Sequence, residues 1–351
     1  MISRRNLVAA AAGLMAAPLA ACQDPTKPGA NPPASSSASA APPAPSSAPS
    51  SGAPAPAQTQ ASAAVSQAAP GPAPAPASSA IAAAADPPPP TRSGPWTRDA
   101  FEEAMAASGR PTQISEAGFQ AIQARKPYAI ARINNYLSER FGQADPKVIA
   151  AFHEVPREYY HYSYPEHYSQ AQQAYEEVPK PWAIGYGSVL SDYLGQAYMT
   201  QIAQPKAGDV SLEIGTGSGF QSSLLSRIVG RAYTIEIIQP IGTAVDRIFK
   251  PLGYDNVEGR VGDGYYGWPE VKDGFDIIMV TCVAQYAPPE LFRQLKPGGR
   301  LIIPIGQPFR RGQVLYVYSK DENGKIHSRR DVGVFFIPMT GAMMDKPAPR
   351  T

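Results

Sequence analysis

A glycine-rich turn is the part of the sequence best suited to chemistry. Gly215, Gly217 and Gly219 alternate with small polar residues. They follow residues 210–214, Val-Ser-Leu-Glu-Ile, which we expect to form a buried strand, and they precede a helical run that starts at Phe220. Glycine has no side chain and tolerates positive φ, so this turn lets the backbone approach a ligand closely. The order of strand, glycine turn and helix predicts a ligand site at the end of the strand.

Three carboxylates accompany the turn. Glu213 lies directly before it, and Glu236 ends a second expected strand about 20 residues further on, where a carboxylate can accept both hydroxyls of a ribose. Asp263 lies in a later Gly-Asp-Gly sequence that ends with Gly264. Its carboxylate can accept a hydrogen bond from an adenine amino group. These residues predict a nucleoside-containing cofactor.

The glycine spacing separates two kinds of nucleotide site. The glycines alone would also fit a nicotinamide enzyme, but a dinucleotide site uses Gly-x-Gly-x-x-Gly with a helix N-terminus facing a pyrophosphate. This chain has Gly-x-Gly-x-Gly with Glu213 before it. A carboxylate there repels a pyrophosphate but suits S-adenosylmethionine, whose ammonium and sulfonium groups are positive. We therefore expect S-adenosylmethionine as the cofactor and no metal.

The surrounding sequence predicts the elements that hold these residues. Further strands are expected at 256–261, 275–281 and 301–305, with a helix at 288–295. Strands that alternate with helices indicate an α/β fold. Upstream, apolar residues at helical spacing over 97–153 predict an N-terminal helical lobe. We expect this lobe and a substrate-side segment to span 95–190, and the cofactor-binding core to span 191–351.

At this point the sequence resembles a known family, the protein-L-isoaspartate O-methyltransferases, over about 133–341. The matching stretches are 155–158, 184–187, 212–220, 252–257, 261–265, 267–269, 295–299 and 336–341. The resemblance implies a doubly wound, Rossmann-like methyltransferase sheet of seven strands. It also implies methyl transfer from S-adenosylmethionine to the free carboxylate of L-isoaspartyl or D-aspartyl residues in damaged proteins, which begins their repair.

The resemblance assigns roles to two further residues. In the family, the loop after the Gly-Tyr-Gly segment contributes a serine to the reaction centre, and here that residue is Ser191. We expect its hydroxyl to orient the acceptor carboxylate. Thr340 corresponds to a cofactor-side contact, and the main chain at 336–339 to a place where the acceptor backbone pairs.

The loop that carries Ser191 departs from the family. The usual bacterial form is Gly-Tyr-Gly-Gln-Thr-Ile-Ser-Gln-Pro, whereas residues 185–193 read Gly-Tyr-Gly-Ser-Val-Leu-Ser-Asp-Tyr. Asp192 adds a negative charge that would repel an anionic acceptor by roughly 1 kcal/mol if partly buried. Tyr193 replaces a rigidifying proline, and Val189 lacks the threonine hydroxyl. Two alternatives therefore stay open: a methyltransferase for a different peptide carboxylate, or a non-catalytic, membrane-tethered binding protein that retains the fold.

The first 22 residues have the pattern of an export signal. Arg4 and Arg5 precede an apolar stretch, and Leu-Ala-Ala-Cys ending at Cys22 resembles a lipobox, while Ser3 to Leu7 resembles a twin-arginine signal. We expect an exported protein, anchored by the acylated Cys22 in a membrane of a bacterial cell envelope, on the periplasmic side. If these residues are not a signal, the protein is cytoplasmic. S-adenosylmethionine is made in the cytoplasm, so export leaves its supply unexplained.

Composition narrows the remaining possibilities. Residues 23–94 are almost entirely Ala, Pro, Ser and Gly, which predicts a disordered linker. A formal net charge of +2 argues against a nucleic-acid partner, and two cysteines with four histidines exclude a zinc module. We expect a monomer. A tyrosine-rich stretch at 159–175 could line a peptide groove, but such clusters more often pack in the core.

Overall fold

The computed structural model of this 351-residue chain describes residues 94–245 and 247–346. The expected signal at 1–22, Cys22 and nearly all of the expected linker at 23–94 lie outside the described residues. Within the described part, no helix is both long enough and apolar enough to cross a membrane.

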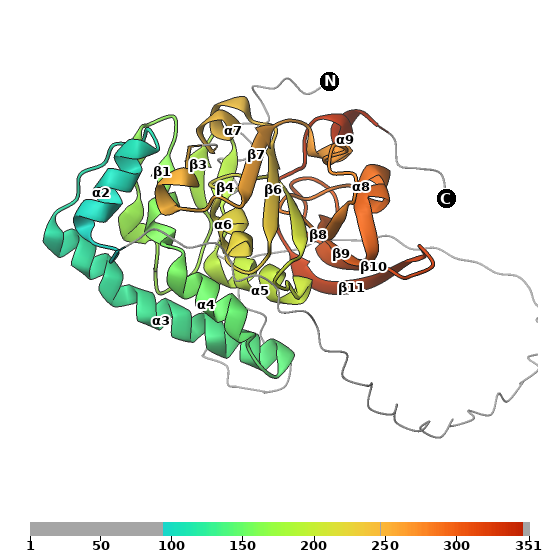
Figure 1. The fold of residues 1–351 in the computed structure, drawn as a ribbon, viewed down its shortest axis with the longest axis horizontal. Coiled ribbons are helices and arrows are strands. Elements are labelled where there is room, and N and C mark those ends of the chain that lie inside the picture. Colours follow the sequence, from blue (N-terminus) through green and yellow to red (C-terminus); the bar gives the residue numbers. More distant parts are fainter. Residues whose placement is uncertain (1–93, 246, 347–351) are drawn as a thin grey trace, which may run out of the picture. The chain divides into compact units, whose positions relative to one another are not determined.

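A seven-stranded sheet forms the centre of the fold, in the order β11-β10-β9-β8-β5-β6-β7 (Figure 1). Its strands are β5 (Val210–Ile214), β6 (Arg231–Glu236), β7 (Val257–Val261), β8 (Phe275–Val280), β9 (Leu295–Ile305), β10 (Gln313–Lys320) and β11 (Ile326–Val334). The five strands from β7 to β9 pair in parallel, and β10 and β11 are antiparallel. The chain reverses its direction across the sheet at β5, so the glycine turn lies at a switch point of the kind where α/β sheets bind ligands.

The expected strands agree closely with the sheet, with one larger difference. The strand expected at 210–214 has these bounds in the structure, and the strand expected at 256–261 starts one residue later, at Val257, whereas the strand expected at 301–305 begins earlier, at Leu295. The sequence Lys-Pro-Gly-Gly at 296–299 suggested a turn. It is instead included in β9, where the pairing with β8 shifts register between Phe275 and Ile277.

Helices cover both faces of the sheet. They are α5 (Tyr193–Ala203), α6 (Phe220–Ser226), α7 (Gln239–Val245), α8 (Pro289–Gln294) and α9 (Ala342–Asp345), with short 3-10 turns η3 (Lys250–Leu252) and η4 (Gly264–Tyr266). Strand residues alternate between the faces. Ile277 and Met279 of β8 pack in the cluster that contains α5 residues. Ile278 and Val280 pack in the cluster with Leu291 of α8. The α/β, doubly wound prediction is confirmed.

The N-terminal lobe is helical, as the sequence indicated. Its elements are α2 (Arg98–Ala107), α3 (Glu116–Phe141), α4 (Pro146–Glu154), η1 (Arg157–Tyr160) and η2 (Ala171–Gln173), followed by the hairpin strands β1 (Tyr162–Ser163), β2 (Tyr168–Ser169), β3 (Trp182–Gly185) and β4 (Ser188–Leu190). Asp145 caps α4 with Pro146 in its first turn, where the missing N–H costs nothing. Gly142 ends α3 in the left-handed conformation.

The tyrosine-rich stretch is mostly core. Tyr159 and Tyr160 are fully buried, and Tyr162, Tyr164 and Tyr175 are nearly so, whereas Tyr168 is exposed. Burial of this kind agrees with the packing interpretation.

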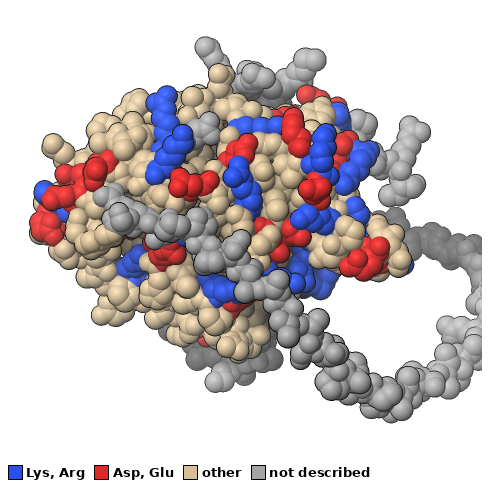
Figure 2. All heavy atoms as spheres, viewed as in Figure 1, with Lys and Arg blue, Asp and Glu red and all other residues tan. Residues whose placement is uncertain are grey.

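Charges are mixed on the outside of the molecule. On the face shown in Figure 2, acidic and basic side chains are interspersed over the described residues. That face carries no extended field of one sign.

Candidate active site

The glycine turn depends on its glycines for backbone geometry. Gly215, Gly217 and Gly219 all have positive φ, at 99°, 54° and 85°. A Cβ atom on Gly215 would lie only 2.7 Å from Oγ1 of Thr281. Thr281 follows β8, and its hydroxyl donates to the carbonyl oxygens of Ile214 (3.0 Å) and Gly215 (2.7 Å). The sequence analysis did not identify Thr281, which ties the turn to the neighbouring strand.

Glu236 joins the end of β6 to the glycine turn. Its Oε2 accepts a hydrogen bond from the Gly217 amide (2.8 Å), and its Oε1 accepts one from the Ile238 amide (2.9 Å). Burial raises the pKa of this carboxyl, and the backbone amides act in the opposite direction. A carboxylate has about four acceptor positions. Each oxygen therefore retains capacity for a ribose hydroxyl, and Glu236 fits the predicted role.

Glu213 is bonded inside the core. Its Oε2 accepts hydrogen bonds from the Ser222 hydroxyl of α6 and from the Thr234 hydroxyl of β6 (3.0 Å). Burial raises its pKa to about 8, although both hydroxyls lower it. Burial thus favours the protonated form of Glu213 over the charged form. This geometry gives Glu213 a positioning role below the turn, and its contact with the cofactor stays a prediction.

Asp263 connects the end of β7 to the C-terminal segment. Its Oδ1 accepts from the Tyr265 amide (2.9 Å), and its Oδ2 accepts from the Ala342 amide (2.7 Å). The glycine that follows it is needed for close packing. A Cβ on Gly264 would lie 2.2 Å from Cγ2 of Ile214, the last residue of β5. Gly264 therefore lets this loop approach the glycine turn.

Thr340 reaches the same edge of the sheet. The segment before it runs beside the loop after β8, because the Val283 amide donates to Ile337 (2.8 Å) and the Met339 amide donates to Val283 (2.8 Å). Thr340 is half-buried and directly precedes Gly341, which packs against Asp263. Several main-chain groups at 336–339, where we expected the acceptor to pair, are thus already bonded within the chain. That pairing stays a prediction.

Ser191 lies at the end of the hairpin that covers the glycine turn. A Cβ on Gly217 would lie 3.6 Å from both the Ser188 hydroxyl and the Val189 carbonyl oxygen of β4. Ser191 follows β4 directly and is half-buried. Its hydroxyl has no hydrogen-bond partner among the described residues. The strand that directly precedes Ser191 therefore lies against the turn, and the role of Ser191 at the reaction centre stays a prediction.

Asp192 begins the next helix. Its Oδ1 accepts hydrogen bonds from the amides of Leu194 (3.0 Å) and Gly195 (2.8 Å), which makes it the N-cap of α5. A carboxylate at a helix N-terminus is stabilised by the free N–H groups there. Tyr193, where the family has proline, is the first residue of this helix.

Two buried charges in η1 have roles that the sequence analysis did not assign. Glu158 is fully buried and accepts hydrogen bonds from Trp96 Nε1 (2.7 Å), Gln123 Nε2 (2.5 Å) and the Tyr175 hydroxyl (2.7 Å). Arg157 is 2% exposed. The only signal in the sequence was their place in the stretch 155–158 that resembles the family.

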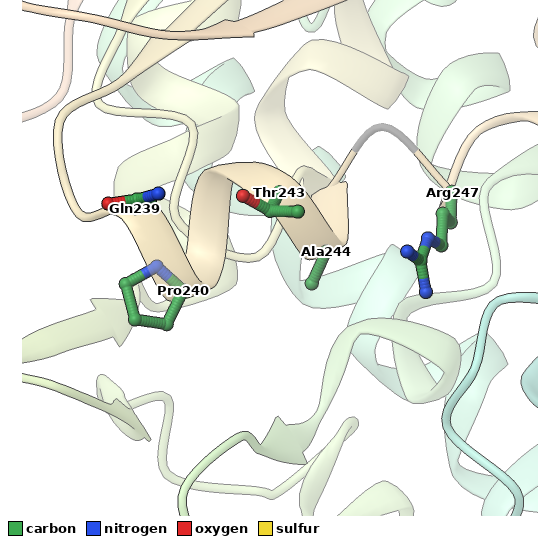
Figure 3. A pocket seen from close by; sticks show the side chains of 5 residues that line it. All are labelled: Gln239, Pro240, Thr243, Ala244 and Arg247. Carbon is green, nitrogen blue, oxygen red and sulfur yellow. The ribbon is translucent and has the colours of Figure 1, made fainter.

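One cavity lies against α7, the helix that follows Glu236 in the sequence. It has a volume of about 420 Å³ and is lined by Gln239, Pro240, Thr243, Ala244 and Arg247 (Figure 3). None of the predicted site residues lines it. Among the described residues, no group of three or more His, Cys, Asp or Glu side chains could hold a metal ion.

The sheet order, the glycine turn at the switch point and Glu236 after the second strand define a class I, S-adenosylmethionine-dependent methyltransferase. A family model described as protein-L-isoaspartate(D-aspartate) O-methyltransferase matches residues 132–344. The chain belongs to this family.

Relatives and solved structures agree with this assignment. The chain is 40% identical to protein-L-isoaspartate O-methyltransferase 2 of Syntrophobacter fumaroxidans over 238 residues, which cover 67% of this chain and 92% of that protein. It is 46% identical to protein-L-isoaspartate O-methyltransferase 1 of Nitrosospira multiformis over 168 residues, 48% of this chain and 70% of that one. A solved protein-L-isoaspartate O-methyltransferase superposes with a TM-score of 0.53 at 28% identity, covering 62% of this chain and 67% of its own.

The predicted family, activity and cofactor are thereby confirmed. The activity is protein-L-isoaspartate O-methylation, and S-adenosylmethionine is the methyl donor. The turn and Glu236 fit that donor, since the turn admits close approach and Glu236 keeps free acceptor positions. The roles of the individual site residues remain predictions.

Proposed function

We propose that this chain methylates isoaspartyl carboxylates at the edge formed by the glycine turn and Ser191. The observation that supports the assignment of this site is the hairpin whose Ser188 and Val189 lie against Gly217, with Ser191 directly after its second strand. Glu236 bonds to the same turn, Gly264 brings the loop of Asp263 against the end of β5, and Thr340 precedes Gly341, which packs against Asp263.

The reaction requires alignment more than acid–base help. An acceptor carboxylate is already ionised at neutral pH. Bound S-adenosylmethionine supplies an electrophilic methyl group, which forms a bond to a carboxylate oxygen as its bond to sulfur breaks. Ser191 donates a hydrogen bond to the acceptor carboxylate and so directs one oxygen towards the methyl group. Holding the reacting atoms in line can supply several kcal/mol of the barrier reduction.

The charge of Asp192 is compensated within the protein. Two amides of α5 bond its carboxylate, and the attraction of Asp192 acts to raise the pKa of the buried Arg157. An anionic acceptor next to Ser191 therefore meets less repulsion than the bare sequence suggested. This supports an isoaspartyl acceptor in spite of the altered loop.

The test uses the full-length protein, labelled S-adenosylmethionine, an isoaspartyl peptide and its normal aspartyl twin. We expect label in the isoaspartyl peptide alone. Ser191→Ala should lower kcat by at least about tenfold, which corresponds to roughly 1.4 kcal/mol of transition-state stabilisation. Ser328→Ala, on exposed β11, is the matched control and should leave kcat unchanged.

The outcomes distinguish the alternatives. Label in both peptides or in neither, with the cofactor bound, would point to a different peptide carboxylate as acceptor. Loss of both binding and transfer would point to a non-catalytic tethered protein. A fully active Ser191→Ala variant would contradict the role given to this residue.

We further propose that the protein is exported and held at the periplasmic side of a cell-envelope membrane by acylated Cys22, as a monomer. The Leu-Ala-Ala-Cys sequence supports acylation, and acyl chains would anchor the chain without a membrane-spanning helix. Replacing Cys22 by Ser should move the protein from the membrane fraction to the soluble fraction. A wild-type protein that stays in the cytoplasm would overturn this proposal.

A further inference from the structure

Arg157 connects the helical lobe to the loop that carries Ser191. It lies in η1 and is 2% exposed. Its guanidinium donates three hydrogen bonds: from Nε to the Ala174 carbonyl (3.1 Å), from one terminal nitrogen to Oε1 of Gln196 (2.6 Å), and from the other to the Ser191 carbonyl (2.7 Å). The two terminal nitrogens thus contact both sides of the junction between β4 and α5.

Apart from the attraction of Asp192, the cation has aromatic surroundings. Its guanidinium lies 4.9 Å from the centre of the Phe220 ring and makes no ion pair within the described part of the chain. Burial lowers the pKa of Arg157 to about 10, so it is protonated at neutral pH. Burying a cation costs several kcal/mol unless its hydrogen bonds are well satisfied. A buried arginine at this position therefore lowers the stability of the fold, which suggests that its hydrogen-bond geometry serves a function.

We propose that Arg157 is a positioning residue of the methyl transfer, which holds the main chain of Ser191 and thereby aims its hydroxyl. The proposal rests on the role given to Ser191 above. The planar guanidinium holds two acceptors in a fixed arrangement, which an ammonium group cannot do. Because one acceptor is Ser191 itself and the other lies in the first turn of α5, the fork fixes how the strand enters the helix.

The altered loop makes the hydrogen bonds from Arg157 more important. The family's proline at the position of Tyr193 would fix φ at the first residue of α5. Tyr193 leaves that angle free, so the junction depends on contacts from elsewhere. These are the Asp192 cap on one side and the Arg157 fork on the other.

Arg157→Lys in the full-length protein tests the proposal, with Arg110→Lys as the matched control. Arg110 is equally buried and donates to the Tyr159 carbonyl (2.9 Å) and the Ser108 hydroxyl (2.9 Å), away from the Ser191 loop. Both variants keep a positive charge and lose the planar guanidinium group. Amide hydrogen exchange over 188–195, kcat and KM for the isoaspartyl peptide, and the cofactor Kd are measured for each.

We expect Arg157→Lys to speed exchange at 188–195 and to lower kcat by about 10- to 100-fold, the cost of a misplaced group of this kind. Its cofactor Kd should stay within about twofold of wild type, because Arg157 makes no hydrogen bond to the glycine turn. Arg110→Lys should lower thermal stability but leave exchange at 188–195 and kcat unchanged.

The opposite results overturn the proposal. Unchanged exchange and kcat in a folded Arg157→Lys variant would show that the fork does not hold the loop, and equal effects of both variants would show a merely structural role. If Arg157→Lys does not fold, Gln196→Leu removes one of the two forked contacts, and the same exchange and kcat changes are expected at smaller size. If the wild-type protein has no isoaspartyl activity, the proposed function is wrong, but hydrogen exchange still shows whether Arg157 holds the main chain at Ser191.

Discussion

The cofactor edge and the Ser191 loop are built in different ways. At the cofactor edge, Glu236 and Asp263 accept hydrogen bonds from backbone amides of the turns that they border. The Ser191 loop is instead held by buried side chains of the helical lobe, with Arg157 reaching Ser191 and Gln196 across 34 and 39 residues of sequence. One region is held mainly by main-chain geometry and the other by side-chain contacts between distant segments.

This difference predicts how each region fails. Where a glycine turn has no room for a Cβ, a substitution causes a steric clash, which lowers the stability strongly and weakens cofactor binding. A loop held by several hydrogen bonds loses them one at a time, and each loss costs about 1 kcal/mol.

The largest effect is expected for Gly264→Ala at the cofactor edge. Its Cβ would lie 2.2 Å from Cγ2 of Ile214, so β5 or the loop must move. We expect a loss of about 3 kcal/mol in the free energy of unfolding, at the upper end for overpacking, together with weaker cofactor binding. Urea unfolding measures the change in stability, and titration calorimetry measures the change in cofactor binding.

Gly262→Ala, two residues earlier, is the control for this clash. A Cβ there would lie 3.5 Å from Cγ2 of Ile235, which is an ordinary contact. We expect a change of less than about 0.5 kcal/mol. Equal effects of the two variants would mean that the cofactor edge is not limited by steric clash.

Glu213→Gln should change how stability depends on pH. Burial raises the pKa of Glu213 to about 8 in the folded protein, from the ordinary glutamate value of about 4.5. Between these values the folded state binds more protons than the unfolded state, so the contribution of Glu213 falls as pH rises. From pH 5 to pH 7, wild type should lose about 2 kcal/mol relative to Glu213→Gln. Parallel urea-unfolding profiles would show that Glu213 is ionised in the folded protein.

The cofactor edge was predictable because its signals are local. The apolar residues Val210, Leu212 and Ile214 indicated β5, and the glycine spacing indicated the turn between β5 and α6. The internal bonding of Glu213 was not predictable, because folding brings Ser222 and Thr234 to its carboxyl from other elements. The role of Asp192 could have been found, since aspartate before a helix is a common N-cap. The contacts of Arg157 gave no local signal.

Asp192→Ala and Asp192→Asn separate capping from charge in the Ser191 loop. Removing the cap with alanine should cost about 1 kcal/mol of stability, whereas asparagine should keep it. Loss of the charge in Asp192→Asn should change KM for the isoaspartyl peptide by less than about twofold, because the amides and Arg157 already compensate it. A fall in KM of about fivefold would instead match the uncompensated repulsion of about 1 kcal/mol that the sequence suggested.

The smallest effect is expected for Tyr193→Phe. Its hydroxyl donates to the Glu176 carbonyl (2.9 Å), and its ring lies 5.8 Å from the guanidinium of Arg157. Phenylalanine keeps the ring and loses the hydrogen bond, so stability should fall by about 0.5 to 1 kcal/mol. Since the Asp192 cap and the Arg157 fork remain, kcat and exchange at 188–195 should not change. A large fall in kcat would mean that the tyrosine hydroxyl, rather than the arginine fork, replaces the family's proline in fixing this junction.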